Sequence, residues 1–207
     1  GTYNTYPSAS TIAGLVTGDS NAAMNVAETS GRWAGYTYPN TSGPTLSSGA
    51  TMQALIKPYG PHTANGGGVV LTLCQDPTTI GNAQCPELVV ADHSSTHFKI
   101  NVNSPGAGTV HQTSMSWPYG SAYLIHLRIN AGNTSADLFV NGALVVSFTA
   151  GSYMFSNIAA ISTGKLTIGG GFYVTRGDYP FNGVVDEVAL YPRPLDNSEI
   201  SAFTAVM

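Results

Sequence analysis

Apolar and polar residues alternate along much of the chain, and this period of two favours β-strands over helices. The segment Phe98–Asn103 shows the pattern most clearly, with its three apolar side chains on one face. Tyr123–Asn130 alternates as well, although Leu124 interrupts its polar face. The same reasoning predicts further strands at Thr11–Val16, Thr51–Lys57, Val69–Cys74, Leu88–Asp92, Lys165–Gly169 and Gly183–Tyr191.

The strongest signal for a β-hairpin lies in the segment Ala136–Ser147. Two apolar runs flank the pair Asn141-Gly142. A two-residue type I′ turn needs a positive φ at both central positions, and asparagine followed by glycine adopts these angles most readily. We therefore predict two antiparallel strands joined by a tight turn at this pair.

Only the C-terminal segment carries clear helix signals. Asp196 can cap the helix, and Glu199 follows three residues later as in a capping box. Ile200 and Phe203 supply one apolar stripe, which must dock on the rest of the protein because so short a helix is unstable alone. We find no internal repeat or linker that would divide the 207 residues. The prediction is one all-β domain over residues 1–207, with two packed antiparallel sheets and a short C-terminal helix.

The composition narrows the classes of partner. Charged residues make up 9% of the chain, against roughly 25% in an average soluble protein. The seven lysines and arginines are scattered and form no basic stripe, which argues against nucleic acid as a partner. Apolar runs stay well short of the roughly 18 residues of a membrane helix, so we expect no membrane insertion.

The two cysteines, Cys74 and Cys85, each border an apolar run. If the two runs are neighbouring antiparallel strands, the loop between them returns both sulfurs to the same end. A disulfide would then close the loop, stabilise the fold by roughly 2–3 kcal/mol and indicate a location outside the reducing cytosol. The alternative is a pair of free thiols.

The C-terminal quarter contains a recognisable order of motifs. Leu166–Gly169 is followed by Phe181–Tyr191, then by Pro194-Leu195 and by Ser198–Ile200. This order resembles the closing signature of the laminin-G-like family, and Asp137–Val145 is similar to the central hairpin of that family. The resemblance implies a concanavalin A-like jelly roll. It specifies a fold and not an activity.

The resemblance also raises the question of calcium, because many laminin-G-like domains bind this ion. Calcium prefers carboxylate and carbonyl oxygens, which loops supply easily. Asp19, Asp178 and Asp186 are the candidates for one structural calcium ion. In the alternative interpretation, Asp186 accepts backbone N–H groups from a neighbouring loop instead.

Few residues offer catalytic chemistry. Asp186 and Glu187 form the only adjacent acid pair, and successive residues of a regular strand point to opposite faces, so the two could not act on one bond. His126 and Arg128 share a strand face, as a polysaccharide lyase would require, but a polar solvent-facing surface is the simpler interpretation. We therefore expect the protein not to be an enzyme.

Aromatic residues concentrate in the predicted loops, where they could stack on the apolar C–H faces of sugars. Tyrosine and tryptophan suit such half-wet positions because each has an apolar body and a polar tip. Each tryptophan could instead fill the core between the sheets. The candidate ligand-binding residues are Trp33, Tyr36, Tyr38, Trp117, Tyr119 and Tyr173, with Arg176 and Asp178 for polar contacts.

The leading hypothesis is a non-catalytic, extracellular recognition module that binds a glycan or another cell-surface receptor. It resembles the laminin-G-like domains of secreted bacterial adhesins and of phage structural proteins, which implies a role in adhesion or on the virion. One alternative is a structural domain that buries an apolar patch in a homo-oligomer. The other is a carbohydrate-active enzyme, either a hydrolase or a lyase.

Overall fold

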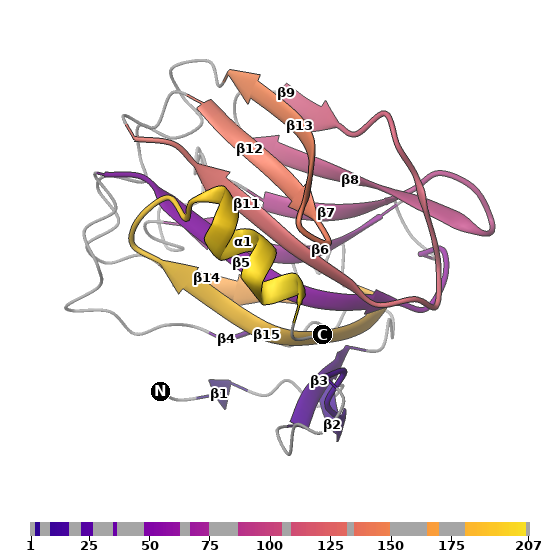
Figure 1. The fold of residues 1–207 in the computed structure, drawn as a ribbon. Helices are drawn as coiled ribbons and strands as arrows, with labels where there is room; N and C mark the ends of the chain where they lie inside the picture. The colour runs from indigo at the N-terminus through magenta and orange to yellow at the C-terminus, as the bar shows by residue number, and fades with distance from the viewer. Residues whose placement is uncertain are drawn as a thin grey trace.

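Two antiparallel β-sheets pack face to face and form a sandwich (Figure 1). The structure, a computed structural model, describes residues 3–4, 9–16, 22–26, 35–36, 48–62, 67–74, 87–104, 109–131, 135–149, 165–169 and 181–205. Among these residues, the single helix is α1 (Asn197–Thr204), near the C-terminus. This architecture confirms the predicted all-β sandwich and agrees with a jelly roll.

The first sheet has seven strands in the order β13-β12-β11-β5-β15-β3-β2. Its central strands, β11, β5 and β15, therefore pair on both sides. The strands are β2 (Ala9–Ala13), β3 (Ala22–Val26), β5 (Ala50–Pro58), β11 (Tyr123–Ile129), β12 (Ser135–Val140), β13 (Ala143–Thr149) and β15 (Gly183–Tyr191).

The second sheet has six strands, in the order β10-β8-β7-β6-β14, with β9 paired to the same edge of β8 as β10. A separate two-stranded pair joins β1 (Tyr3–Asn4) to β4 (Gly35–Tyr36), and β4 contacts β14. The six strands are β6 (Gly67–Cys74), β7 (Glu87–Asp92), β8 (His97–Ser104), β9 (Thr109–Gln112), β10 (Trp117–Pro118) and β14 (Lys165–Ile168).

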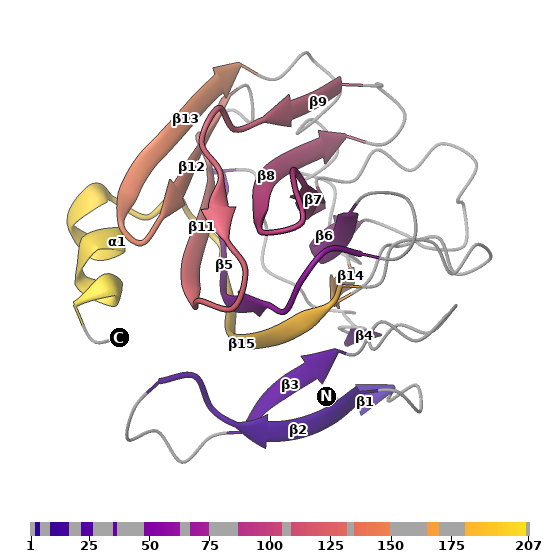
Figure 2. The ribbon, with the colours of Figure 1, turned by 90° about the vertical axis from the view of Figure 1, so that its right-hand side faces the viewer.

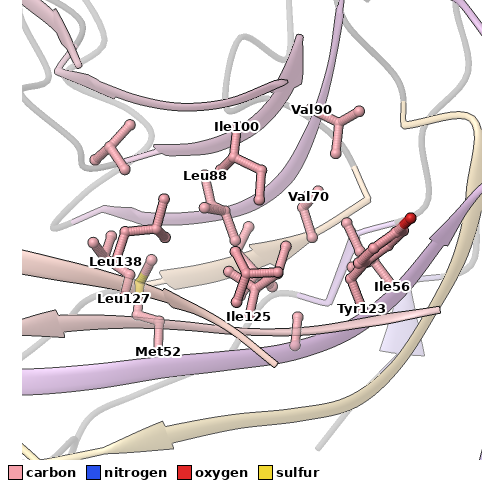
Figure 3. Close-up of a cluster of buried hydrophobic side chains, with 14 of the residues drawn as sticks. Met52, Ile56, Val70, Leu88, Val90, Ile100, Tyr123, Ile125, Leu127 and Leu138 are labelled. Atoms are coloured by element: carbon pink, nitrogen blue, oxygen red, sulfur yellow. The ribbon is translucent and has the colours of Figure 1, made fainter. Parts of the chain in front are cut away.

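The hydrophobic core lies between the sheets (Figure 3). Alternate residues of each strand face inward, as their period of two predicts, and interdigitate with those of the opposite sheet. Figure 3 shows Leu88, Val90 and Ile100 of the six-stranded sheet facing Ile125 and other residues of the seven-stranded sheet. Each fully buried aliphatic side chain contributes about 1.5–3 kcal/mol.

The local signals in the sequence are confirmed where they were strongest. Asn141 and Gly142 both have a positive φ, at 49° and 75°, and join β12 to β13. Asp196 caps α1 in a complete capping box with Glu199. Strand β15 has the bounds that its alternation predicts.

Strands β3 and β10 could not be predicted from the sequence pattern. Strand β3 is rich in alanine, and β10 contains two residues, so neither shows an alternation that sequence analysis could detect. Strand β15 is also less regular than expected. Its register with β5 shifts between Asp186 and Ala189, and Glu187 has a positive φ of 46°. The prediction of regular alternation through Asp186-Glu187 is therefore wrong at this bulge.

Helix α1 covers the outer face of the seven-stranded sheet, on the side away from the six-stranded sheet (Figure 2). Phe139, Leu195 and Ile200 form a small second core beneath it. His126 lies on this face and is fully buried, in ring contact with Phe203 of the helix. The expectation of a solvent-facing surface at His126 and Arg128 is therefore wrong, because a helix distant in sequence covers the strand.

The cysteine pairing stays a prediction, because Cys85 lies outside the described residues. Strands β6 and β7 are antiparallel neighbours, as the prediction assumed. The described pairing of the two strands ends at Thr72 and Glu87.

Candidate functional site

One end of the sandwich gathers several chain segments around the carboxylate of Asp92, at the end of β7. We call this region the Asp92 rim, and it comprises residues 59–62, 92–97, 114–122 and 181–182. Backbone hydrogen bonds join its segments. Tyr59 donates to the carbonyl of Asn182, Tyr119 donates to that of Thr96, and Gly120 donates to that of the adjoining Pro58.

Asp92 accepts hydrogen bonds from two other segments of the rim. Its Oδ1 lies 2.7 Å from the Tyr119 hydroxyl and 3.0 Å from His62 Nδ1. Its Oδ2 accepts the backbone N–H of His62 at 2.9 Å. The Asp92 side chain is 18% exposed, so this carboxylate lies close to the surface while its donors hold it in place.

His62 connects Asp92 to Asn182, which directly precedes β15. Its Nε2 accepts the backbone N–H of Asn182 at 3.2 Å, so the ring proton sits on Nδ1 and is donated to Asp92. The His62 side chain is 1% exposed. Both ring nitrogens are occupied, so His62 acts here as a structural connector and not as a general base.

Gly68 of β6 makes room for the His62 ring. A Cβ added at Gly68 would clash with His62 Nε2 and lie 2.7 Å from the Cα of Phe181. Glycine is therefore required at this position by the close approach of two rim residues.

Two aromatic residues of the rim and Tyr123 of β11 surround Phe98, a fully buried core residue. Trp117, Tyr119 and Tyr123 lie with ring centroids 6.0, 5.5 and 5.4 Å from that of Phe98. Tyr123 is buried and donates its hydroxyl to the carbonyl of Pro118. Trp117 and Tyr119 are half-buried, so each has one part in the core and another at the surface.

Burial raises the pKa of the Tyr119 hydroxyl, and the hydrogen bond to Asp92 raises it further. The phenol therefore keeps its proton at all physiological pH values. Around it the rim is polar and accessible. Tyr59 is 47% exposed and Met115 55%, and residues 93–96 and 120–122 are exposed.

The structure places the predicted ligand-binding residues in more than one region. Trp117 and Tyr119 lie together on the Asp92 rim, beside one edge of the six-stranded sheet. Tyr36 belongs to β4, which contacts β14 at the opposite edge. Four strand spacings separate these edges, or about 19 Å, so Tyr36 cannot share one small site with Trp117 and Tyr119. The remaining candidates lie outside the described residues: Trp33, Tyr38, Tyr173, Arg176 and Asp178.

The sequence patterns did not predict Asp92, His62 and Tyr59 as members of a site. Asp92 and His62 are 30 residues apart, and Tyr119 is 27 residues from Asp92. The one local signal was the place of Asp92 at the end of a predicted strand, where the chain turns at the surface.

Asp186 was a candidate calcium ligand, and its carboxylate oxygens already have partners. Oδ2 accepts the backbone N–H of Leu15 at 2.8 Å, and Oδ1 accepts that of Glu187. This is the arrangement that the alternative interpretation expects. Asp19 and Asp178 lie outside the described residues. Within the part of the chain that the structure describes, no three histidine, cysteine or acidic residues cluster as a metal site would.

A second polar cluster lies on the outer face of the seven-stranded sheet, beside α1. Arg128 donates to Asp137 Oδ2 from Nε at 3.1 Å and from Nη2 at 2.9 Å. Asn130 and Ser147 also donate to Asp137. Burial alone would raise the pKa of the Asp137 carboxyl, but these hydrogen bonds outweigh it and lower the pKa. Arg128, Asn130 and Ser147 each donate to this carboxylate, which indicates a structural role for Asp137.

A family model described as the concanavalin A-like lectin/glucanases superfamily, of laminin G type, matches residues 34–201. The chain belongs to this family. The match spans the six-stranded sheet, the seven-stranded sheet except β2 and β3, and most of α1, and it confirms the resemblance drawn from the closing signature. No curated protein sequence matches this chain.

Solved structures of similar fold come from several organisms. Domain 4 of AbnA, a GH43 extracellular arabinanase of Geobacillus stearothermophilus in complex with arabinotriose, is 14% identical with a TM-score of 0.62. The alignment covers 95% of this chain and 81% of that one. The CBM40 of the Ruminococcus gnavus IT-sialidase, bound to α2,3-sialyllactose, is 17% identical with a TM-score of 0.54, over 82% and 96% of the two chains.

The heptameric SAP-like pentraxin of Limulus polyphemus is 12% identical with a TM-score of 0.61, over 87% of this chain and 80% of that one. At such low identities the likeness shows the fold alone. Among the residues that the structure describes, no helix has the length and apolar character needed to cross a membrane.

Proposed function

We propose that the protein is a non-catalytic glycan-binding module and that the Asp92 rim is its binding surface. The observation that carries the proposal is the grouping of half-buried Trp117 and Tyr119 with exposed Tyr59 around a fixed carboxylate. An aromatic face beside hydrogen-bonding groups suits a sugar, which has apolar C–H faces and hydroxyls on one ring. Structures of similar fold, in complex with arabinotriose and with sialyllactose, support the same class of ligand.

The polar groups of the rim favour binding over catalysis. A glycosidase needs two carboxyl groups about 5–10 Å apart across the scissile bond. The described segments of the rim contain one carboxylate, Asp92, and His62 beside it has both ring nitrogens occupied. A lyase built on His126 is disfavoured as well, because that ring is fully buried.

Glycan array binding tests this function. The chain should bind at least one class of glycan, and Trp117→Ala should weaken that binding at least about tenfold by removing a stacking face. Leu144→Ala is the control, because it also truncates an apolar side chain at the surface, at 55% exposure, but lies on β13, away from the rim. Unchanged affinity in Trp117→Ala would remove Trp117 from the site. Release of reducing sugar from a polysaccharide panel would instead favour an enzyme.

The finer role that we propose is adhesion or receptor binding outside the cell or on a virion. A disulfide between Cys74 and Cys85 would agree with that location and stabilise the fold by about 2–3 kcal/mol. Peptide mapping without reductant should recover the two cysteines in one linked pair of peptides. Two separately alkylated peptides would contradict the disulfide.

One structural calcium ion at Asp186, with Asp19 or Asp178, also stays a proposal. A bound ion should raise the melting temperature in calcium above that in a chelator. An identical melting temperature in both would leave Asp186 with its hydrogen-bonding role alone.

The second candidate function is assembly into a homo-oligomer. Strand β13 lies at the edge of the seven-stranded sheet and exposes Leu144, and unpaired edge strands favour association. Sedimentation that depends on concentration, without binding to any glycan, would favour this function. A monomer at all concentrations would dismiss it.

A further inference from the structure

The hydrogen bonds of the Asp92 rim determine which way each proton points. Asn182 donates its N–H to His62 Nε2, so His62 must donate from Nδ1 to Asp92. The Tyr119 hydroxyl donates its single proton to Asp92 Oδ1 at 2.7 Å. A phenol has no second proton, so the Tyr119 oxygen can only accept a hydrogen bond from any ligand.

The charge of the rim also limits which ligands can bind. Asp92 is its one carboxylate, and the described segments 59–62, 92–97, 114–122 and 181–182 contain no lysine or arginine. The donors to Asp92 are a phenol, an imidazole and a backbone amide, none of which is a guanidinium or ammonium group. A ligand carboxylate brought against Tyr119 would therefore meet a like charge, with no lysine or arginine among the described residues of the rim to offset it.

We infer that Asp92 and His62 hold Tyr119 as an obligate hydrogen-bond acceptor, and that the rim therefore selects neutral saccharides. The selected sugar donates a hydroxyl or an amide N–H to the Tyr119 oxygen, whereas a sugar acid with its carboxylate at this place is rejected. Asp92 and His62 act as positioning residues through Tyr119. This inference rests on the proposed function and adds the chemical class of ligand to it.

The first experiment is a glycan array that carries sialylated glycans together with their desialylated counterparts, probed with the full chain at pH 7.5. Wild-type protein should prefer the neutral member of each pair. The variant Asp92→Asn places an amide next to Tyr119 and removes the negative charge, so the preference for neutral glycans should fall about fivefold. Asp137→Asn is the matched control, because it makes the same change in the cluster beside α1 and should keep the preference.

The second experiment measures the hydrogen bond itself by titration calorimetry, with the best neutral glycan of the array and its mono-O-methyl derivatives. Methylation of the donating hydroxyl should weaken binding to wild-type protein about fivefold. Tyr119→Phe should bind the parent glycan about fivefold more weakly and lose no further affinity on that methylation. Melting curves confirm that each variant is folded, and a merely structural role of Tyr119 would not couple to one ligand hydroxyl.

The outcomes separate this inference from the proposed function. Tighter binding of sialylated glycans, or methylation losses of equal size in wild-type protein and Tyr119→Phe, would overturn the inference while glycan binding stands. Failure to bind any glycan on the array would remove the proposed function and the inference with it.

Discussion

Two partly buried carboxylates, Asp137 and Asp92, differ in their partners. Asp137, beside α1, is paired with the Arg128 guanidinium and with two neutral donors. Asp92, at the rim, receives hydrogen bonds from neutral groups or a histidine alone. A carboxylate neutralised by an adjacent cation acts mainly on the fold. One held by neutral donors at the surface keeps its negative field available to whatever approaches.

The surroundings of Asp137 and Asp92 differ as well. Arg128 also donates to the carbonyl of Leu195 and stacks over the ring of Phe139 at 4.8 Å, so it joins the sheet to the segment leading into α1. Among the described residues, no element covers the rim in this way, and it ends in exposed serine, threonine and aromatic residues. We therefore expect changes beside α1 to affect stability first and changes at the rim to affect binding first.

The largest expected effect follows Arg128→Met. This variant leaves the Asp137 carboxylate without its cation while both side chains of the pair are mostly buried, so the free energy of unfolding should fall by about 3 kcal/mol. Urea unfolding at pH 7.5 measures the loss, and glycan affinity should not change. A loss below about 1 kcal/mol would show that water screens the pair, and the contrast with Asp92 would then fail.

A smaller effect comes from His126, which is buried beneath α1 next to Gln53. Burial lowers the pKa of His126 from 6.5 to about 4, so the folded state binds its proton less readily than the unfolded state does. Stability is therefore complete above the unfolded pKa and declines as the pH falls from 6.5 toward 4, by about 2 kcal/mol at pH 5.

His126→Gln keeps a donor for Gln53 and removes the titration, so its unfolding free energy should change less between pH 7.5 and pH 5. The exposed residue His93 provides the control, since His93→Gln should leave the pH dependence of wild-type protein in place. A pH profile of His126→Gln equal to that of wild-type protein would mean that His126 does not couple acid to stability.

Tyr123→Phe tests whether a buried hydrogen bond from β11 holds the rim in place. The change removes the hydroxyl that donates to the carbonyl of Pro118 at 2.9 Å, which should cost about 1 kcal/mol in unfolding free energy. Because Pro118 lies between Trp117 and Tyr119, glycan affinity should also fall. Loss of stability with unchanged glycan affinity would indicate that ring contacts with Phe98 are sufficient to position Trp117 and Tyr119.

The smallest effect is expected at the start of α1. Asp196→Ala removes the acceptor for the Glu199 backbone N–H and so breaks the capping box. Hydrogen exchange should become faster in residues 197–204 and stay unchanged at the rim, whereas Ser201→Ala, which lies on the same helix but outside the capping box, should have little effect. Faster exchange at the rim would show that the two regions are coupled.

Sequence patterns predicted the fold well because strands and turns leave local signals. Alternation located β8, β11 and β15, and Asn141-Gly142 located the hairpin. The patterns could not show that α1 returns to cover His126, since that contact depends on tertiary packing. For the site they selected Trp117 and Tyr119 by residue type, yet gave no indication of Asp92 or His62. Those two meet only after separate strand ends come together, and hydrogen bonds over such separations leave no periodic signal.

The close approach of Gly68 to His62 has a consequence for anyone who wishes to redesign ligand preference. A randomised library should spare Gly68, His62 and Asp92, because most replacements there would disturb the frame that carries the aromatic pair. Diversity is better introduced at positions 94–96 and 114–116, where the side chains point largely to solvent or lie at the surface. Such a library would change the surface side chains of the rim and leave Gly68, His62 and Asp92 in place.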